Sequence, residues 1–302
     1  MNLLVVGSIG IDTVQTPVAH RENLLGGSAV YFSYAASFFT KVCIVGVVGE
    51  DFPAEHRGLL LERGIDLAGL ETKPGRTFRW TGKYHRNMDD RDTLDVQLNV
   101  FGEFVPTVPP AAAQADFLFL ANIVPAQQHK VLTQMKKRPS FVAADTMNLW
   151  IENARQDLDA LVREIDALVL NESEARMYSG EHELLRAGRA IMAKGPATVI
   201  IKKGEHGSLV VTPGGSFCVP AYPLDEVVDP TGAGDSFAGA FMGYLAGRGA
   251  VTPADLRRAV AYGSVVASFT CQGFSLDALR TATRAAIDAR FQELLEMTRI
   301  PA

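Results

Sequence analysis

The sequence predicts an α/β protein: a mostly parallel central sheet, helices on both of its faces, and a smaller β-sheet that projects from it. Two observations predict this class. Short apolar, β-branched runs alternate with helical patterns along most of the chain, and two segments with neither pattern interrupt the alternation. Strand–helix–strand alternation requires crossover connections, which place successive strands in parallel. We expect residues 1–302 to form one such domain.

The predicted strands of the central sheet are runs that are mostly apolar throughout, as strands buried on both faces are. They cover residues 3–7, 41–49, 117–121, 140–145, 167–171 and 198–204. The N-terminal stretch MNLLVVGSIGID has no basic segment before its apolar run, and Asp12 interrupts it. It therefore indicates a first strand and not a signal peptide.

Helical patterns fill the intervals between these strands. They cover residues 28–39, 52–63, 126–137, 154–164, 172–178, 183–194, 235–247 and 253–270, and a final amphipathic helix is expected over 276–302. In the helix at 235–247 the apolar residues fall on one stripe, at Phe237, Phe241, Tyr244 and Leu245.

Two segments, 12–25 and 76–105, carry no helical period. The first is polar, and the second alternates aromatic and β-branched residues with polar ones, which is typical of strands. We expect them to form the small projecting sheet, with a hairpin turn at NMDDRD, residues 87–92. The segment PTVPP, residues 106–110, then marks the return to the core.

Composition and charge exclude several classes of protein. The formal net charge is −5 and the isoelectric point is near 5.7. This argues against a nucleic-acid partner, which requires a basic face. No apolar run approaches 18 residues, so we expect no membrane span. The three cysteines lie far apart in sequence, which indicates free thiols in a reducing compartment, and we expect a cytoplasmic protein.

The most unusual run in the chain is DPTGAGDSFAGAF, residues 229–241. Gly232, Ala233 and Gly234 place adjacent backbone N–H groups at a predicted helix start, where the helix dipole favours an anion. Asp235 follows directly. A carboxylate there can be a simple helix cap. It can also be the base that takes a proton from a hydroxyl group attacking a bound phosphoryl group.

Other phosphate-binding and nucleophile motifs do not occur. The chain has no GxxxxGK[ST] sequence and no GxSxG elbow. The GAGDSF segment fails the last position of GxGxxG and does not follow the first strand, where a dinucleotide fingerprint belongs.

DPTGAGDSFAGAF closely resembles the C-terminal signature of the PfkB, or ribokinase-like, family of carbohydrate and nucleoside kinases. Further segments resemble family motifs in the family's order: GSIGID at 7–12, GGSAVYF at 26–32, VVGED at 47–51, NESE at 171–174 and KKGEHG at 202–207. The resemblance spans most of the chain. It implies a ribokinase-like three-layer core with a β-sheet lid, to which 12–25 and 76–105 correspond.

The resemblance assigns roles in phosphoryl transfer. Asp235 would be the catalytic base, and Gly232, Ala233 and Gly234 would form the anion hole. Asn171 and Glu174 would organise Mg²⁺, with Glu174 binding through water; a helix cap is the local alternative for Asn171. Cofactor-binding residues would also include Lys203, Gly204 and Gly207 beside the ATP. Asp229 and Thr231 match the place where some family members bind a monovalent cation such as K⁺.

The resemblance also assigns substrate contacts, to Asp12 and to the pair Gly26 and Gly27. Tyr31 stands where many family members carry an asparagine that contacts substrate hydroxyls. Its ring could stack on a base or sugar, or pack in the core. Asp145 and Asn148, in DTMNLW, resemble the family's DxN segment only loosely.

The resemblance implies a magnesium- and ATP-dependent kinase that phosphorylates a hydroxymethyl group of a sugar. A nucleoside kinase of the same fold is the first alternative, because Trp80, Tyr84, Phe101 and Tyr31 offer aromatic surface for a base. A nucleotide-binding regulatory protein without catalysis is the second. The expected partner is a small sugar or nucleoside, and some family members pair their lids as homodimers.

Overall fold

The computed structural model describes residues 2–88 and 90–300. Within them, a nine-stranded sheet has the strand order β13-β12-β11-β10-β9-β8-β1-β4-β5, with every neighbouring pair parallel except β11–β12 and β12–β13. Its strands are β1 (Leu3–Val6), β4 (Val42–Gly49), β5 (Asp66–Lys73), β8 (Phe117–Leu120), β9 (Phe141–Asp145), β10 (Ala167–Asn171), β11 (Thr198–Lys202), β12 (Ser208–Thr212) and β13 (Gly215–Val219).

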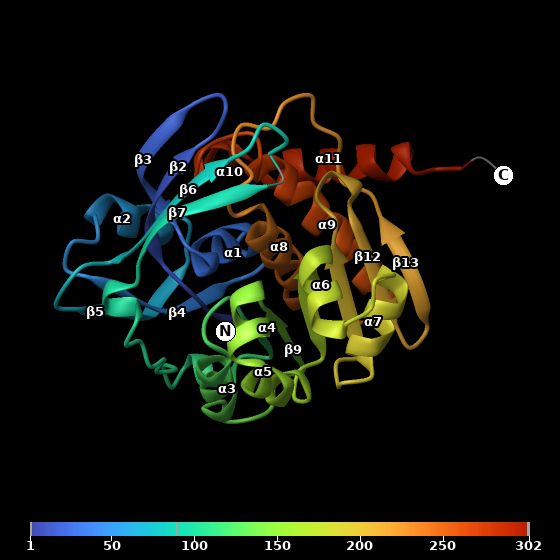
Figure 1. The fold of residues 1–302 in the computed structure, drawn as a ribbon, viewed down its shortest axis with the longest axis horizontal. Helices are drawn as coiled ribbons and strands as arrows, with labels where there is room; N and C mark the ends of the chain where they lie inside the picture. The colour runs from blue at the N-terminus through green and yellow to red at the C-terminus, as the bar shows by residue number, and fades with distance from the viewer. Residues whose placement is uncertain (1, 89, 301–302) are drawn as a thin grey trace.

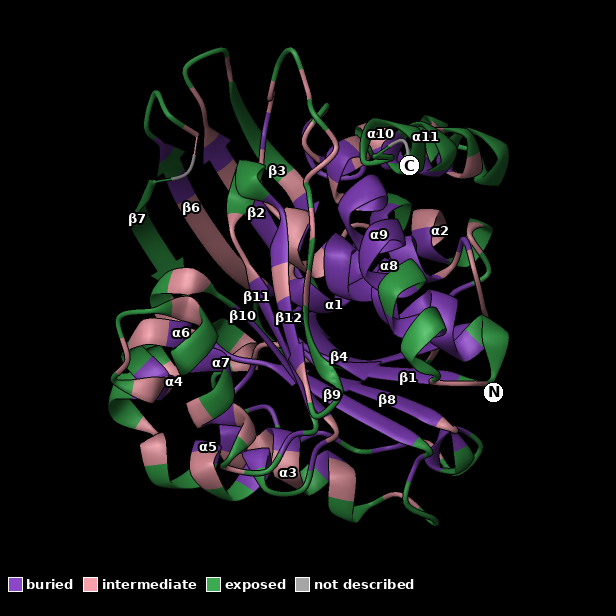
Figure 2. Cartoon of the chain, turned by 90° about the vertical axis from the view of Figure 1, so that its right-hand side faces the viewer, coloured by how far each residue is buried: buried purple, intermediate pink, exposed green. Residues whose placement is uncertain are grey.

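Helices cover both faces of this sheet (Figures 1 and 2). One layer contains α1 (Ser28–Ala36), α2 (Ala54–Glu62), α8 (Ala233–Arg248), α9 (Pro253–Thr270), α10 (Asp277–Thr281) and α11 (Arg284–Met297). The other contains α3 (Pro125–Thr133), α4 (Asn148–Asn153), α5 (Arg155–Val162), α6 (Glu172–Ser179) and α7 (Leu184–Met192). The predicted α/β class with a mostly parallel central sheet is confirmed.

The apolar strand runs follow from this layering. In β1, Leu3 and Val5 belong to the core beneath α1, α8 and α9, whereas Leu4 and Val6 belong to the core beneath α5, α6 and α7. Successive side chains of a strand point to opposite faces, so a strand covered on both sides must be apolar at every position.

We call the smaller, four-stranded sheet of order β3-β2-β6-β7 the lid, after the role that the sequence predicts for it (Figure 1). Its strands are β2 (Gly10–Gln15), β3 (His20–Gly26), β6 (Phe78–Tyr84) and β7 (Arg91–Gln97). The two segments expected to form a small sheet therefore do pair, through the parallel β2–β6 contact. The expected hairpin joins β6 to β7, although Asp89 in its turn lies outside the described residues.

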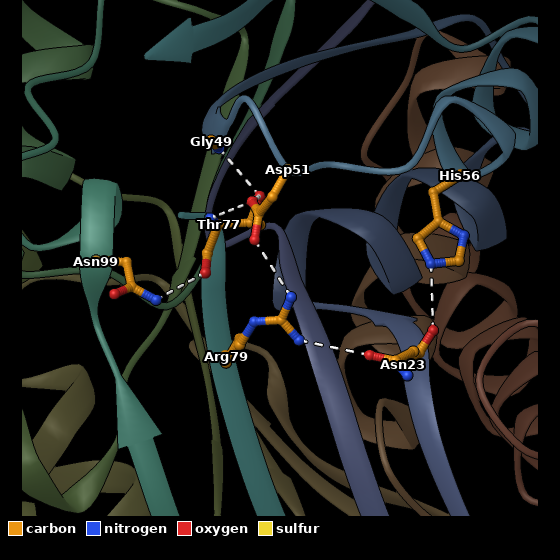
Figure 3. Close-up of polar contacts among 7 residues, drawn as sticks. All are labelled: Asn23, Gly49, Asp51, His56, Thr77, Arg79 and Asn99. Carbon is orange, nitrogen blue, oxygen red and sulfur yellow. Dashed lines mark hydrogen bonds and ion pairs between the residues drawn. The ribbon is translucent and has the colours of Figure 1, made fainter. Parts of the chain in front are cut away.

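A polar cluster joins the base of the lid to the core (Figure 3). The Asp51 Oδ1 accepts hydrogen bonds from the backbone N–H and the hydroxyl of Thr77, both at 2.7 Å. Its Oδ2 pairs with Arg79 at 3.2 Å. The Asn99 amide donates to the Thr77 carbonyl at 2.9 Å, and a ring nitrogen of His56 lies 3.3 Å from the Asn23 carbonyl. These contacts fix the start of β6 against the loop that follows β4.

Some elements differ from the sequence-based expectations. The expected helix over 276–302 is wrong as a single helix, because Ala282 is extended and the Thr283 hydroxyl caps a new helix by accepting the Ala286 N–H at 3.1 Å. The strand β5, the hairpin β12–β13 and the short helix α4 were not expected. Residues 301–302 lie outside the described part. No helix in that part is long and apolar enough to span a membrane.

Candidate active site

The candidate active site lies at the carboxyl edge of the parallel strands, where ligands of open α/β sheets bind. Asp145, Asn171 and Lys202 are the last residues of the adjacent strands β9, β10 and β11. Helix α8 begins on the other side of the same edge, and the charge of Asp235 in its first turn influences Asp145 and Glu174. The topology therefore brings together motifs that are far apart in sequence.

The glycine-rich turn before α8 is shaped by Gly232. This residue is the N-cap, with a left-handed φ of 77°, and the helix starts at Ala233. A Cβ at Gly232 would overlap the ring of Tyr31, which lies directly beneath the turn. The Ala233 N–H donates to the Pro230 carbonyl at 3.1 Å, whereas the Gly234 N–H has no hydrogen-bond partner among the described residues, so Gly234 supplies the free donor that an anion site requires.

Asp235 is the third residue of α8 and not its N-cap, and no side chain caps this helix. Burial raises the pKa of its carboxyl group, whereas the cations of Lys202 and Arg91 lower it. A carboxylate with a raised pKa is a better proton acceptor near neutral pH. The geometry therefore separates Asp235 from the simple capping role that the sequence left open.

Asp12 lies on lid strand β2 and is 4% exposed. Gly26 explains how it fits: a Cβ at that position, on the neighbouring strand β3, would overlap the Asp12 carboxylate. At Gly27, which has a φ of 102°, a Cβ would lie 2.7 Å from the Cα of Ile9. The glycine pair thus makes room for the carboxylate and lets the chain turn tightly into α1.

The pKa of Asp12 is raised to about 8, first by burial and then by the charges of Asp229 and Asp235. The three carboxylates therefore share one site. In the unfolded chain Asp12 has a pKa of about 3.9. Between these values the folded protein holds a proton that the unfolded chain has lost, so the free energy of unfolding falls as pH rises from about 4 to about 8.

Replacing Asp12 with asparagine is expected to weaken this pH dependence. As the pH is raised from 5 to 8.5, the thermal midpoint of the wild type should decrease. The midpoint of Asp12→Asn should decrease less, so the variant becomes more stable relative to the wild type. The exposed Asp157, replaced in the same way, is the control. Parallel melting curves for Asp12→Asn and wild type across this range would contradict the placement of a buried, proton-binding carboxyl at residue 12.

Asn171 and Glu174 form a capping box at the start of α6. The Asn171 side chain accepts the Glu174 N–H at 2.8 Å, and the Glu174 carboxylate accepts the Asn171 N–H at 2.7 Å. Burial raises the pKa of Glu174, against the lowering effect of Lys202 and Arg91. Asn171 and Glu174 therefore cap α6, and Glu174 is also close enough to Asp235 for their charges to interact. Their predicted role in holding Mg²⁺ stays a prediction.

Asp145 is buried, and its Oδ1 has no hydrogen-bond partner among the described residues. Burial and the nearby charge of Asp235 raise its pKa well above the usual range, although the Lys202 cation opposes them. A buried carboxylate oxygen without a partner is costly unless a cation or donor binds it. Asp145 therefore belongs to the candidate site. The sequence alone did not place it there, because DTMNLW resembles the family's DxN segment only loosely.

Lys203, Gly204 and Gly207 form the turn between β11 and β12. The Lys203 N–H donates to the Gly207 carbonyl at 2.7 Å. Gly207 has a φ of 80°, and a Cβ there would lie 2.6 Å from the Ala221 nitrogen. The turn therefore packs closely against residues 219–221, and its predicted contact with a nucleotide stays a prediction.

Asp229 is fully buried beside the turn that leads into α8. Its Oδ1 accepts the Thr231 N–H at 2.9 Å, whereas its Oδ2 has no hydrogen-bond partner among the described residues. Burial raises its pKa. The Thr231 hydroxyl donates to the hydroxyl of Tyr84 at 3.1 Å, so this turn also touches the lid.

The inner face of the lid carries Trp80, which is in register with Asp12 across the parallel β2–β6 pair. The Trp80 ring lies over Gly82, where a Cβ would overlap it, and its Nε1 donates to the Thr93 hydroxyl at 3.2 Å. The Arg91 guanidinium carbon lies 5.7 Å from the ring centroid. Of the predicted aromatic surfaces, Trp80 is half-buried, whereas Tyr84 and Tyr31 are buried.

Sequence reasoning missed Lys202 and Arg91, whose charges act on Asp235 and Glu174. Within the described residues, no group of three or more histidine, cysteine, aspartate or glutamate side chains is arranged to hold a metal ion.

Comparisons with known proteins identify the family and the fold. A model of the pfkB family carbohydrate kinases matches residues 2–281. The cytidine kinase of Thermococcus kodakarensis is 34% identical over 257 residues, which cover 82% of this chain and 90% of the relative. The fructoselysine 6-kinase of Escherichia coli is 28% identical and covers 88% of this chain and 97% of its own. A structure from E. coli assigned as ribokinase II, solved with ATP and Mg²⁺, has a TM-score of 0.80 at 20% identity and covers 97% of this chain and 99% of its own.

Proposed function

The chain belongs to the pfkB family of carbohydrate kinases, and from this premise we propose that it transfers the γ-phosphoryl group of ATP to a hydroxymethyl group of a sugar. The observation that carries the proposal is the position of Asp235. It lies in the first turn of α8 next to Gly234, whose N–H has no hydrogen-bond partner among the described residues, and its pKa is raised. This is the arrangement needed where hydroxyl group, base and phosphoryl group meet.

The proposed reaction is a direct displacement. Asp235 accepts the proton of the acceptor hydroxyl, the acceptor oxygen forms a bond to the γ-phosphorus, and the bond from that phosphorus to the β,γ-bridging oxygen breaks, releasing ADP. The Gly234 N–H stabilises the charge on the transferred group, whereas the Ala233 N–H already donates to the Pro230 carbonyl at 3.1 Å. Asp12 orients the acceptor through its hydroxyls, and the lid excludes water, which would compete as acceptor.

The residues present fit a magnesium ion. The Asp145 Oδ1 is buried without a partner among the described residues, and the Glu174 carboxylate lies beside the same site. Mg²⁺ is usually held by one or two carboxylates together with water and substrate phosphates. We propose that Asp145 and Glu174, with the Asn171 turn, hold it. When bound it would neutralise phosphate charge.

A monovalent cation such as K⁺ is proposed at Asp229 and the Thr231 carbonyl. The support is the fully buried Asp229 carboxylate, whose Oδ2 has no hydrogen-bond partner in the described part of the chain. A bound cation would offset the cost of burying this charge. Potassium chloride should then raise the thermal midpoint more than an equal concentration of N-methylglucamine chloride; equal midpoints would remove the support.

The test of the main proposal is a coupled ADP-release screen with sugars, sugar phosphates and nucleosides as acceptors, followed by identification of the phosphorylated hydroxyl. ADP release that depends on one acceptor supports a kinase. ATP binding without turnover for any acceptor would favour the nucleotide-binding regulatory protein.

A nucleoside kinase is the second candidate function, and Trp80 favours it. This half-buried indole lies on the inner face of the lid beside Asp12, where a base attached to a hydroxyl-bound ribose could stack. The relative of 34% identity is a cytidine kinase, which agrees with such an acceptor.

Replacing Trp80 with leucine distinguishes the two acceptors. Stacking of a base on an aromatic ring is worth about 1–3 kcal/mol, so kcat/KM for a nucleoside should fall about 5- to 150-fold. The same variant should change kcat/KM for a simple sugar by less than about threefold. An unchanged kcat/KM for the nucleoside would exclude base stacking at Trp80.

We also propose that the lids of two copies pair. Strand β7 is the exposed edge of the lid, and Leu94, Val96 and Leu98 on or next to it are 52%, 47% and 52% exposed. An exposed apolar edge strand favours pairing with another chain. Sedimentation should therefore show a dimer that Leu94→Asp weakens, and a monomer at all concentrations would contradict the pairing.

A further inference from the structure

Lys202 is a cation at the core of the site, and the sequence analysis gave this first residue of KKGEHG no role. It is the last residue of β11, half-buried, and it reaches the first turn of α8: a Cβ at Gly234 would lie 2.7 Å from its Nζ. Among residues 2–88 and 90–300, the lysine ion pairs within 4.0 Å are those of Lys73, Lys137 and Lys194, and Lys202 forms none. Lys202 therefore contacts the helix start without being held in an ion pair there.

This placement brings two positive features together. The N-terminus of a helix carries a partial positive charge, so a cation beside it is unfavourable. Longer-range attraction comes from Asp145, Asp235 and Glu174, whose pKa values the Lys202 charge lowers. An anion between the ammonium group and the N–H groups of the helix would turn this repulsion into two favourable contacts.

Asp145 gives an independent indication that a ligand belongs here. Its side chain is 7% exposed, and its Oδ1 has no hydrogen-bond partner among the described residues. It ends the strand β9, and its charge is coupled to both Lys202 and Asp235. Asp145 and Lys202 are thus near each other without forming an ion pair. Such a pair of opposite charges suits a phosphate ligand that brings its own cation: the lysine binds the phosphate and the aspartate binds the cation.

We propose that Lys202 binds the phosphoryl group that is transferred, from the side opposite the Gly234 N–H. This rests on the function proposed above, and it adds a residue that touches the reacting group. An ammonium group on a flexible stem has three rotatable donors, so it can stay with the equatorial oxygens as the phosphorus moves from ADP to the acceptor. Lys202 gives up no proton: the acceptor proton goes to Asp235.

The structure distinguishes Lys202 from its neighbour Lys203. Lys203 begins the turn after β11, and its N–H closes that turn on Gly207. Lys202 is the residue whose ammonium group reaches α8 and whose charge acts on Asp235. The sequence KKG alone cannot separate the two.

The test replaces Lys202 with methionine, which keeps the length of the stem and removes the charge, and with arginine, which keeps the charge. Lys130, exposed on α3, is replaced with methionine as the matched control. Binding of ATP and of AMP is measured by calorimetry for each protein, which requires no acceptor. Losing a charged hydrogen bond to the γ-phosphate should weaken ATP binding about ten- to a hundredfold, and AMP binding should change by less than about twofold.

A kinetic readout follows once an acceptor is known. Lys202→Met should lower kcat at least tenfold, and Lys202→Arg should recover part of it. The acid limb of the pH–rate profile should move to higher pH, because Lys202 holds the pKa of Asp235 down. The variant leaves unchanged the other titratable groups that interact electrostatically with Asp235. These are Arg91, Asp12, Asp145, Glu174 and Tyr31.

The outcomes separate this inference from the proposed function. If no acceptor is phosphorylated but Lys202→Met still weakens ATP and not AMP, the phosphate contact stands and the kinase proposal fails. Equal losses of ATP and AMP binding, or wild-type ATP affinity and kcat in a folded Lys202→Met, overturn the inference. If Lys202→Met lowers the thermal midpoint sharply, the same binding measurements are made on Lys202→Thr, which has a short polar side chain.

Discussion

Replacing Asp235 with asparagine is expected to lower kcat by about 10²–10⁴-fold, the usual contribution of a general base. Asparagine keeps the size of the side chain but cannot accept the proton of the acceptor hydroxyl. The fold should persist, because Asp235 neither is the N-cap of α8 nor caps it through its side chain. Burial raises the pKa of this carboxyl group, so removing its charge should hold or raise the thermal midpoint near neutral pH.

Asp255 provides a matched control, because it occupies the same third position of α9. There the carboxylate does cap: its Oδ2 accepts the Thr252 N–H at 3.3 Å and the Thr252 hydroxyl at 2.6 Å. Asp255→Asn should therefore lower the thermal midpoint and leave kcat unchanged, the reverse of Asp235→Asn. Near wild-type kcat in Asp235→Asn would show that this carboxylate is not the base.

Replacing Gly232 with alanine is expected to damage both stability and turnover. The φ of 77° costs a residue with a Cβ about 1 kcal/mol, and the added methyl group would also overlap the ring of Tyr31. Tyr31 is buried at 2% exposure and cannot move freely. The turn must therefore shift, which displaces the Gly234 N–H that we propose as a donor to the phosphoryl group. Loss of one such donor typically lowers kcat by about 10²–10³-fold.

Gly249→Ala is the control that separates the backbone strain of a positive φ from the steric overlap with Tyr31. Gly249 caps the other end of α8 with a φ of 66°, and a Cβ there would have no atom within 4 Å. The Gly249→Ala variant should lose about 1 kcal/mol of stability and keep full activity. The thermal midpoint should be lower for Gly232→Ala than for Gly249→Ala, and only the former should lose kcat. Equal midpoints and full activity in both would mean that the turn at 232 is not the anion site.

The sequence predicted the buried strands well because burial on both faces leaves a continuous apolar run, as in β1 and β4. Strand β5 was missed for the opposite reason. It is the edge strand next to β4, and its sequence DLAGLETK is partly exposed, with no β-branched run. The break at residues 282–283 was missed because neither Ala282 nor Thr283 disrupts the apolar pattern of the two helices it separates.

The candidate site was only partly predictable. Asp235, Asn171 and Glu174 stand in recognisable motifs, and the structure places them at one edge of the sheet. Lys202 and Arg91 carry no such signal, because a single charge at the end of a strand is usually solvated. Their proximity to Asp235 arises from the strand order and from the lid folding over the core, which are tertiary properties.

The lid's origin in two separate stretches of chain bears on how such a protein can acquire new substrates. Asp12 lies on β2, which follows β1 after three residues, and β3 leads directly into α1. Trp80, Tyr84 and Arg91 lie instead on the β6–β7 hairpin, a separate excursion from the core that is held at its base by Asp51 and Thr77. Tyr84 and Arg91 tie this hairpin to the turn before α8, through the Thr231 hydroxyl and the charge of Asp235. The Trp80 indole bonds instead within the hairpin, to Thr93. A substitution at Trp80 can therefore change the surface beside Asp12 while the contacts of Tyr84 and Arg91 are kept, so positions within one hairpin differ in how freely they can vary.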